Sequence, residues 1–146
     1  MKKIVLFAAL LTATALCLCG CEKEQIGFEK KVNGGSYLEI TAAELYGFYE
    51  DEDVLLVAVD SPDPELVIPG TDMHVPYHDV EASRERFPED KSARIVIYCT
   101  TSAFSYRAAT ALAEDGYTNV YELYGGSAEW SNQGYPASLY DGQSLE

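Results

Sequence analysis

Apolar residues along the chain recur in short runs separated by polar, helix-compatible segments. Two runs, residues 54–59 and 94–98, are apolar without alternation apart from Arg94 at the start of the second, which is typical of strands buried on both faces of a parallel sheet. Shorter runs at residues 37–40, 73–75 and 120–123 indicate further strands. Because helical segments separate several runs, the pattern predicts an α/β fold of right-handed βαβ units, with a small parallel β-sheet flanked by helices on both faces.

Polar residues mark where the helices should begin. Thr41 and Glu44 form a capping box that opens a helix through about Tyr49. Ser105 is expected to cap a helix through residue 113, and Ser127 to cap a short later helix. The helices therefore fall between the predicted strands.

Composition narrows the function classes. The 146 residues suit one ordinary domain, and 24 acidic against 10 basic residues give a formal net charge of −14. A nucleic-acid binder needs a basic face, which this chain lacks. An aromatic content of 12 % and ordinary Gly and Pro counts also exclude a collagen, a coiled coil and a disordered chain.

The amino terminus carries a targeting pattern. Residues 1–3 are Met-Lys-Lys, and the apolar segment at 4–18 is shorter than the roughly 20 residues that span a bilayer, so residues 1–20 are predicted to be a signal peptide. Leu18-Cys19-Gly20-Cys21 resembles the lipobox of bacterial lipoproteins, which would make Cys21 the lipidated first residue of the mature chain. Cleavage elsewhere and an uncleaved anchor stay open as alternatives.

Cleavage before Cys21 would change the net charge to −16, because Lys2 and Lys3 leave with the signal. Anionic headgroups would repel such a chain, so membrane attachment must come from acyl chains such as palmitate alone. Residues 21–35 are polar and turn-rich and are expected to be a flexible tether for a domain at 36–146. The expected location is the cell envelope, on the periplasmic or extracellular side.

Cysteine usage singles out one thiol. Cys17 and Cys19 leave with the signal peptide and Cys21 is acylated, so Cys99 is the remaining free thiol. An unpaired thiol in an oxidising compartment invites oxidation, so it is expected to be either buried or useful. On count alone, a buried packing cysteine is the simpler interpretation.

The position of Cys99 favours chemistry more strongly. It ends the predicted strand at residues 94–98, and ligands of open α/β sheets bind beyond the carboxyl ends of strands. The following loop can curl so that consecutive backbone N–H groups face the thiol, with a helix dipole behind them. Such a nest would stabilise a thiolate, a persulfide or an oxyanion, which makes a functional role as well supported as packing.

The carboxyl-terminal half carries an ordered set of motifs. A strand-Cys-loop-helix unit around Cys99 is followed by Gly-Tyr at 116–117, Val-Tyr-x-Leu at 120–123 and Gly-Gly-x-x-x-Trp-x-x-x-Gly-Tyr-Pro at 125–136. In this combination the motifs resemble the carboxyl half of a rhodanese domain. The amino half is similar more loosely, and the resemblance covers about residues 36 to 137.

The resemblance implies a single-domain, rhodanese-like sulfurtransferase in which Cys99 accepts sulfane sulfur as a persulfide. Its partners would be a small sulfur donor or a protein persulfide, and a thiol or other nucleophilic acceptor. No metal or organic cofactor is needed in such a mechanism. The loop that would bind substrate comprises Thr100, Thr101, Ser102, Ala103, Phe104 and Ser105.

The loop departs from the family pattern in its charge. Members with thiosulfate activity usually carry Arg or Lys right after the cysteine and at the end of the loop, where this chain has Thr100 and Phe104. A dianion such as thiosulfate binds poorly without a guanidinium. We therefore expect a neutral or protein-borne sulfur donor, contacted by Phe104 and the hydroxyl groups of the loop.

Three alternatives remain beside the enzyme. A rhodanese-like module that has lost its chemistry and serves for binding fits the cation-free loop. A cysteine-dependent phosphatase needs an arginine at the sixth residue after the cysteine, where Ser105 stands, and is disfavoured. A purely structural lipoprotein would need a fully protected Cys99.

A metal site is not expected. His74 and His78 are the two histidines, and Pro76 between them prevents a shared helical face. We interpret both as surface residues.

Overall fold

The computed structural model describes residues 26–60, 66–76, 78–80 and 82–139. The predicted signal peptide, Cys21 and the first part of the predicted tether lie outside these ranges. Within them, no helix has the length and apolar character needed to cross a bilayer.

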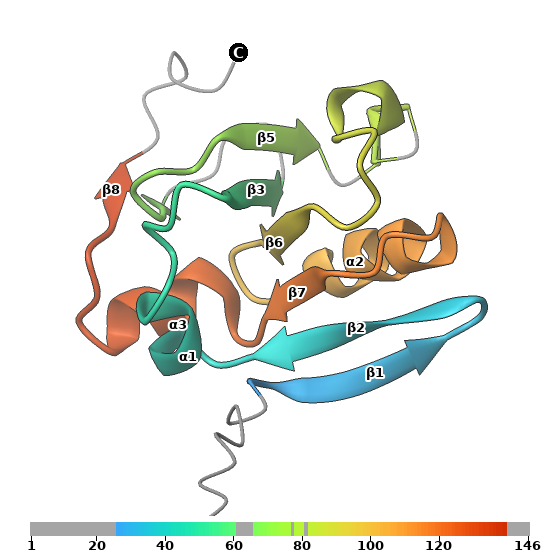
Figure 1. Ribbon diagram of the computed structural model, residues 1–146. Helices are drawn as coiled ribbons and strands as arrows, with labels where there is room; N and C mark the ends of the chain where they lie inside the picture. The colour runs from blue at the N-terminus through green and yellow to red at the C-terminus, as the bar shows by residue number, and fades with distance from the viewer. Residues whose placement is uncertain (1–25, 61–65, 77, 81, 140–146) are drawn as a thin grey trace, which may run out of the picture.

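A six-stranded sheet forms the centre of the molecule (Figure 1). Its strand order is β1-β2-β7-β6-β3-β5, and every neighbouring pair is parallel except β1 and β2. The strands are β1 Phe28–Val32, β2 Gly35–Ile40, β3 Val54–Asp60, β5 Met73–Pro76, β6 Arg94–Tyr98 and β7 Val120–Leu123. A separate antiparallel pair consists of β4, Leu66–Val67, and β8, Ser138–Leu139.

Helices cover both faces of this sheet (Figure 1). Helix α2, Ser105–Glu114, packs on one face against β2, β7, β6 and β3. Helices α1, Ala42–Tyr46, and α3, Gly126–Asn132, contact each other on the opposite face. Each face has its own buried cluster, one including Leu112 of α2 and the other Trp130 of α3. The predicted α/β architecture is confirmed.

The first two strands correct the prediction of a tether. Residues 28–35, which the sequence placed in a flexible segment, form β1 and the turn into β2. Asn33-Gly34 makes that turn, with Gly34 at φ +89°, and Lys30 pairs with Glu39 of β2 at 3.1 Å. Strand β1 is an edge strand with mostly exposed side chains, so it carries no apolar run.

The capping box opens α1 as predicted. The Glu44 amide donates to Thr41 Oγ1 at 3.3 Å, and the Thr41 amide donates to Glu44 Oε2 at 2.7 Å. The helix ends at Tyr46 and not near Tyr49, because the amide of Gly47 closes the last turn on Glu44.

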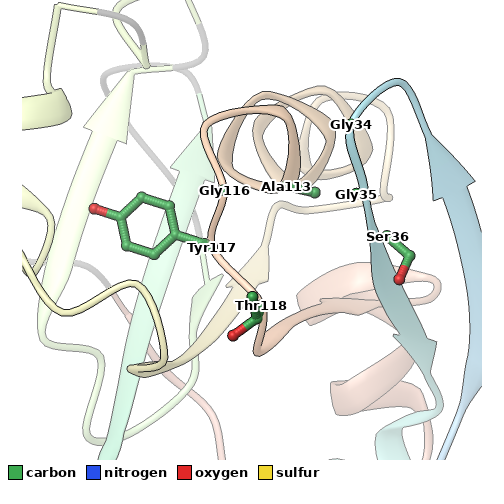
Figure 2. A pocket seen from close by; sticks show the side chains of 7 residues that line it. All are labelled: Gly34, Gly35, Ser36, Ala113, Gly116, Tyr117 and Thr118. Atoms are coloured by element: carbon green, nitrogen blue, oxygen red, sulfur yellow. The ribbon is translucent and has the colours of Figure 1, made fainter.

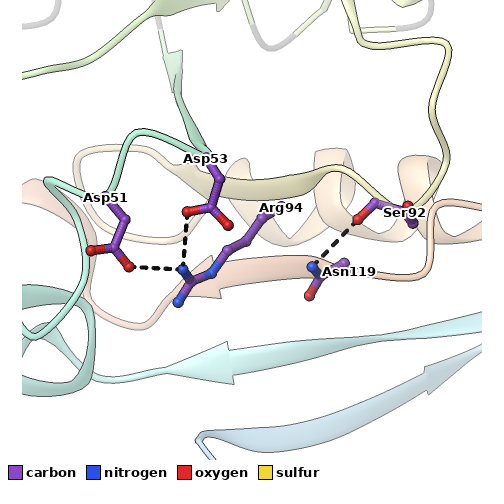
Figure 3. Close-up of polar contacts among 5 residues, drawn as sticks. All are labelled: Asp51, Asp53, Ser92, Arg94 and Asn119. Carbon is purple, nitrogen blue, oxygen red and sulfur yellow. Dashed lines mark hydrogen bonds and ion pairs between the residues drawn. The ribbon is translucent and has the colours of Figure 1, made fainter.

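Arg94 fastens the amino-terminal edge of the sheet (Figure 3). Its Nη1 lies 2.9 Å from Asp51 Oδ2 and 3.5 Å from Asp53 Oδ1, while its guanidinium lies 4.2 Å from the ring centroid of Phe48. Close by, the Asn119 side-chain amide donates to Ser92 O at 3.4 Å. These contacts join the starts of β3, β6 and β7 and leave the carboxyl edge to the cysteine loop.

Candidate functional site

Cys99 follows the last residue of β6 at the carboxyl edge of the sheet, as its position in the sequence indicates. The residue is 2 % exposed, and its sulfur is a free thiol. The thiol donates a hydrogen bond to Ser105 Oγ, with an S–O distance of 3.4 Å. The sulfur is thus buried, but it contacts a polar group at the start of α2.

A second hydrogen bond extends this contact to an acid. Ser105 Oγ donates to Glu122 Oε1 at 2.6 Å. Ser105 and Glu122 are 0 % and 1 % exposed. Three buried side chains from β6, α2 and β7 therefore form a continuous path from thiol to hydroxyl to carboxyl group.

Glu122 is an acid in the middle of the sheet. Its neighbours in the register of the sheet are Glu39 on β2 and Ile97 on β6. Burial raises the pKa of Glu122 above its ordinary value, although hydrogen bonds from Ser105 and Ser102 act in the opposite direction. The charged form of this carboxyl group is therefore less stable than that of a solvent-exposed glutamate.

The loop after Cys99 is held in shape by Ser102. Ser102 lies in the left-handed region, with φ +69°, which residues other than glycine rarely adopt. Its hydroxyl donates to Leu123 O at 2.9 Å and accepts from the Gly125 amide at 2.8 Å. These two bonds tie the turn of the cysteine loop to the end of β7.

The start of α3 holds the same loop from another side. The amides of Ser127 and Ala128 donate to Cys99 O at 2.9 Å and to Thr100 O at 3.0 Å. This close approach requires glycine at residue 126, whose φ is +61°, because a Cβ there would overlap Cys99 O. Two successive amides of α3 thus fix the backbone at Cys99 and Thr100, one at each residue.

Comparisons with known proteins identify the family of this chain. The family model described as "Rhodanese-like domain" matches residues 41–133. The chain belongs to the rhodanese-like family. A protein named "Sulfurtransferase" from Allochromatium vinosum is 34 % identical over 95 residues, which are 64 % of this chain and 86 % of the relative.

Solved structures share the rhodanese-like fold. A rhodanese-related protein from Thermoplasma volcanium superposes with a TM-score of 0.59 at 21 % identity, covering 70 % of this chain and 98 % of the other. The Alr3790 protein from Anabaena gives a TM-score of 0.60 at 24 % identity, with coverages of 69 % and 80 %. At this level of identity the likeness concerns the fold alone.

In this rhodanese-like domain the predicted loop residues lie together between β6 and α2. Thr101 and Ala103 are exposed, whereas Thr100, Ser102 and Phe104 are half-buried. The Cys99 thiol donates its hydrogen bond to the hydroxyl group of Ser105 and not to a backbone group. The cradle of amides that the sequence suggests around a charged sulfur stays a prediction.

Two serines differ from their expected roles as helix caps. Helix α2 starts at Ser105 itself, with Phe104 at the N-cap position, and the Ser105 hydroxyl bonds to Glu122 instead of a helical amide. Helix α3 starts at Gly126, so Ser127 lies inside the helix, with its hydroxyl buried and without a hydrogen-bond partner among the described residues. The N-cap lies one residue before the expected position in α2 and two residues before it in α3, so both serines fall inside their helices and their hydroxyl groups are buried.

Sequence reasoning missed Glu122. The signal was present: a single charged residue stands in the short strand motif at 120–123, next to apolar strands. A carboxyl group in such a place is costly unless it is bonded, and therefore marks a site.

Two surface pockets of the domain are not lined by Cys99 or its loop. One of about 270 Å³ lies between the β1–β2 turn and the carboxyl-terminal end of α2 (Figure 2), at the opposite end of this helix from Cys99. The close packing there depends on Gly35, where a Cβ would lie 2.6 Å from Ala113 O. A second of about 370 Å³ is lined by Phe28, Glu39, Ile40, Thr41 and Tyr124.

In the described ranges no group of three or more His, Cys, Asp or Glu could hold a metal ion.

Proposed function

We propose that the protein is a sulfurtransferase that carries sulfane sulfur as a persulfide on Cys99. The observation that carries the proposal is the place of this free thiol, at the junction of β6 and α2 in a rhodanese-like fold and bonded to Ser105. The likeness to the sulfurtransferase of Allochromatium vinosum supports the same class of reaction.

The proposed reaction has two steps at one sulfur atom. First, the Cys99 thiolate attacks the outer sulfur of a donor R–S–SH, a bond forms between Sγ and that sulfur, and the S–S bond of the donor breaks. The leaving R–S⁻ keeps the bonding electron pair, and Cys99 becomes Cys99–S–SH. In the second step an acceptor thiolate attacks the outer sulfur, and the Cys99 thiolate is released again.

We further propose that the donor is a neutral or protein-borne sulfur compound. Residues 100–104 contain no Lys or Arg. Phe104, at the end of the loop, packs against the buried cluster on the α2 face. This loop therefore offers hydroxyl groups and one aromatic ring to a donor and no guanidinium to the two charges of thiosulfate.

The direct test is uptake of sulfur by Cys99. We expect exposure to a small organic persulfide R–S–SH, followed by blocking with iodoacetamide, to add one sulfur atom to the tryptic peptide at residues 95–107, which contains Cys99 as its one cysteine. Mass spectrometry of this peptide keeps Cys17, Cys19 and Cys21 out of the measurement. Thiosulfate in place of this persulfide should add sulfur to no more than a trace of the peptide.

Two control results decide the interpretation. Cys99→Ser should show no added sulfur, while Thr118→Val, an exposed change at the end of α2 opposite the cysteine loop, should retain the uptake. Failure of the wild-type peptide to gain sulfur would favour the binding module, which the 2 % exposure of Cys99 and the cation-free loop also fit.

We also propose that the domain is tethered to a membrane through a lipid on Cys21. The support is the lipobox-like Leu18-Cys19-Gly20-Cys21 after an apolar segment. In a bacterial host fed a labelled palmitate analogue, we expect the wild-type chain to take up label and to partition with membranes. Cys21→Ala should do neither, whereas Cys99→Ala should behave like the wild type; label on Cys21→Ala would refute the assignment.

A further inference from the structure

One buried acid of the site has no part in the reaction as described so far. Among the described residues, Glu122 is the carboxyl group that lies almost fully buried, at 1 % exposure. It is connected to the Cys99 thiol through one hydroxyl group, by contacts of 3.4 Å and 2.6 Å. An ionised carboxyl group in this position lowers the stability of the folded protein. Its hydrogen-bonded path to the thiol indicates a role in the reaction at Cys99.

We propose that Glu122, acting through Ser105, is the acceptor of the proton that leaves the Cys99 thiol. The inference rests on the proposed function, because a thiolate is the form that attacks a sulfur donor. Glu122 itself touches no substrate in this scheme, and Ser105 is the group that contacts the reacting sulfur.

The proton transfer balances without any further reactant. The S–H proton of Cys99 moves to Ser105 Oγ as the hydroxyl proton of Ser105 moves to Glu122 Oε1. The products are a thiolate at Cys99, an intact hydroxyl group at Ser105 and a neutral carboxyl group at Glu122. Directions of the two existing hydrogen bonds, thiol to hydroxyl and hydroxyl to carboxyl, already match this transfer.

The site holds one negative charge before and after the transfer. A thiolate formed beside a carboxylate that stays ionised would place two negative charges in a buried space, which is costly. Moving the proton to Glu122 avoids that second charge. Burial raises the pKa of Glu122, which makes it a better proton acceptor than an exposed glutamate.

The other groups that face Glu122 are consistent with this role. The hydroxyl group of Ser102 in the cysteine loop lowers the pKa of this carboxyl group, whereas Glu39 on β2 raises it. Lys30 of β1 opposes this effect, but it is paired with Glu39 at 3.1 Å. Tyr37 of β2 is buried beside the same acid, and burial together with the Glu122 charge raises the pKa of its hydroxyl. No cation bonds to Glu122 among the described ion pairs.

The test is the pH dependence of thiol reactivity, which does not require sulfur transfer. The full-length chain is treated with iodoacetamide between pH 5.5 and 8.5, and the rate is followed in the peptide at residues 95–107. In the wild type, the thiolate forms when a proton moves from Cys99 to Glu122, and no proton is released to solvent. The population of this thiolate therefore does not change with pH as long as Cys99 and Glu122 together hold one proton. We expect its rate to change less than about threefold between pH 6.5 and 7.5.

Removing either part of the path should steepen this profile. Glu122→Gln keeps the shape of the side chain and an acceptor for Ser105 but takes no proton. We expect its rate to fall about tenfold per pH unit below neutrality, as for an isolated thiol, and to lie about tenfold below the wild type at pH 6.5. Ser105→Ala should give the same steep profile, and Ser105→Thr should restore the shallow one.

The matched control removes a neighbouring acid. Glu39→Gln deletes a carboxylate on the adjacent strand that bonds to Lys30, and the shallow profile should persist. Folding is checked by thermal unfolding. The raised pKa means that the folded state loses stability as pH rises above the pKa of an unfolded glutamate, so Glu122→Gln should be at least as stable as the wild type at pH 7.

Opposite results would overturn the inference. If Glu122 acts only as a fixed negative charge, Glu122→Gln will react faster than the wild type at pH 7, with equally steep profiles for both. Sulfur uptake by Cys99 with an unchanged profile in Glu122→Gln would refute the proton path and leave the sulfurtransferase intact. A steepened profile without sulfur uptake in the wild type would refute the proposed function and leave the path.

Discussion

Gly126→Ala is expected to destabilise the protein by about 2 to 5 kcal/mol, a large part of the typical stability of a domain. An alanine at φ +61° costs roughly 1 to 2 kcal/mol, because its Cβ approaches the following carbonyl oxygen. The new Cβ would also overlap Cys99 O and lie 2.6 Å from Thr100 O. Relieving such an overlap by a backbone shift costs typically 1 to 3 kcal/mol.

The backbone shift at residue 126 would also affect the reaction at Cys99. Cys99 O and Thr100 O accept from the first amides of α3, and both bonds must lengthen if residue 126 moves away. We therefore expect Gly126→Ala to lose sulfur uptake at Cys99 to a greater extent than its loss of stability explains. Urea unfolding measures the first effect, and mass spectrometry of the peptide at residues 95–107 measures the second.

Gly134 provides the matched control. It also has a positive φ, +81°, but a Cβ there would meet nothing within 4 Å. Gly134→Ala should lower the free energy of unfolding only by the cost of placing an alanine at positive φ, roughly 1 to 2 kcal/mol, and should retain sulfur uptake. Equal losses in the two variants would mean that the contact between α3 and the cysteine loop is not needed.

The sheet was predictable because burial leaves a strong signal. The strands at residues 54–60 and 94–98 are apolar apart from Asp60 and Arg94 at their ends, and helices were placed correctly between the strands. Strand β1 was not predictable in the same way, since four of its five residues are exposed at the edge of the sheet. The turn signal of Asn33-Gly34 was the available clue, and it was interpreted as part of a tether.

The candidate site was predictable only as far as a single position marks it. Cys99 stood out because it ends a buried strand before a helix, and its loop was identified with it. The role of Ser105 could not follow from its position, because a hydroxyl group at a helix start can cap that helix or turn inward. Its partner Glu122 lies 17 residues away, and only the packing of α2 on β7 brings the two together.

Phe104→Arg is expected to let Cys99 take up sulfur from thiosulfate, a sulfur donor that the wild type uses poorly. The side chain stands at the end of the cysteine loop, directly before α2, and is half-buried against the core. Hydrogen bonds from a charged group contribute about 1.5 to 3 kcal/mol each. One guanidinium contact with thiosulfate should therefore raise sulfur uptake from this donor roughly 10- to 100-fold.

The replacement should be tolerated, because the aliphatic stem of arginine can cover the apolar surface that the ring now covers. Phe104→Leu is the control: it keeps an apolar contact without a cation, and its uptake from thiosulfate should stay at the wild-type level. Uptake from the organic persulfide should persist in both variants, which shows that Cys99 still reacts. Efficient uptake from thiosulfate by the wild type, lost in Cys99→Ser, would instead refute the proposed donor class, since a loop without Lys or Arg would then suffice for a dianion.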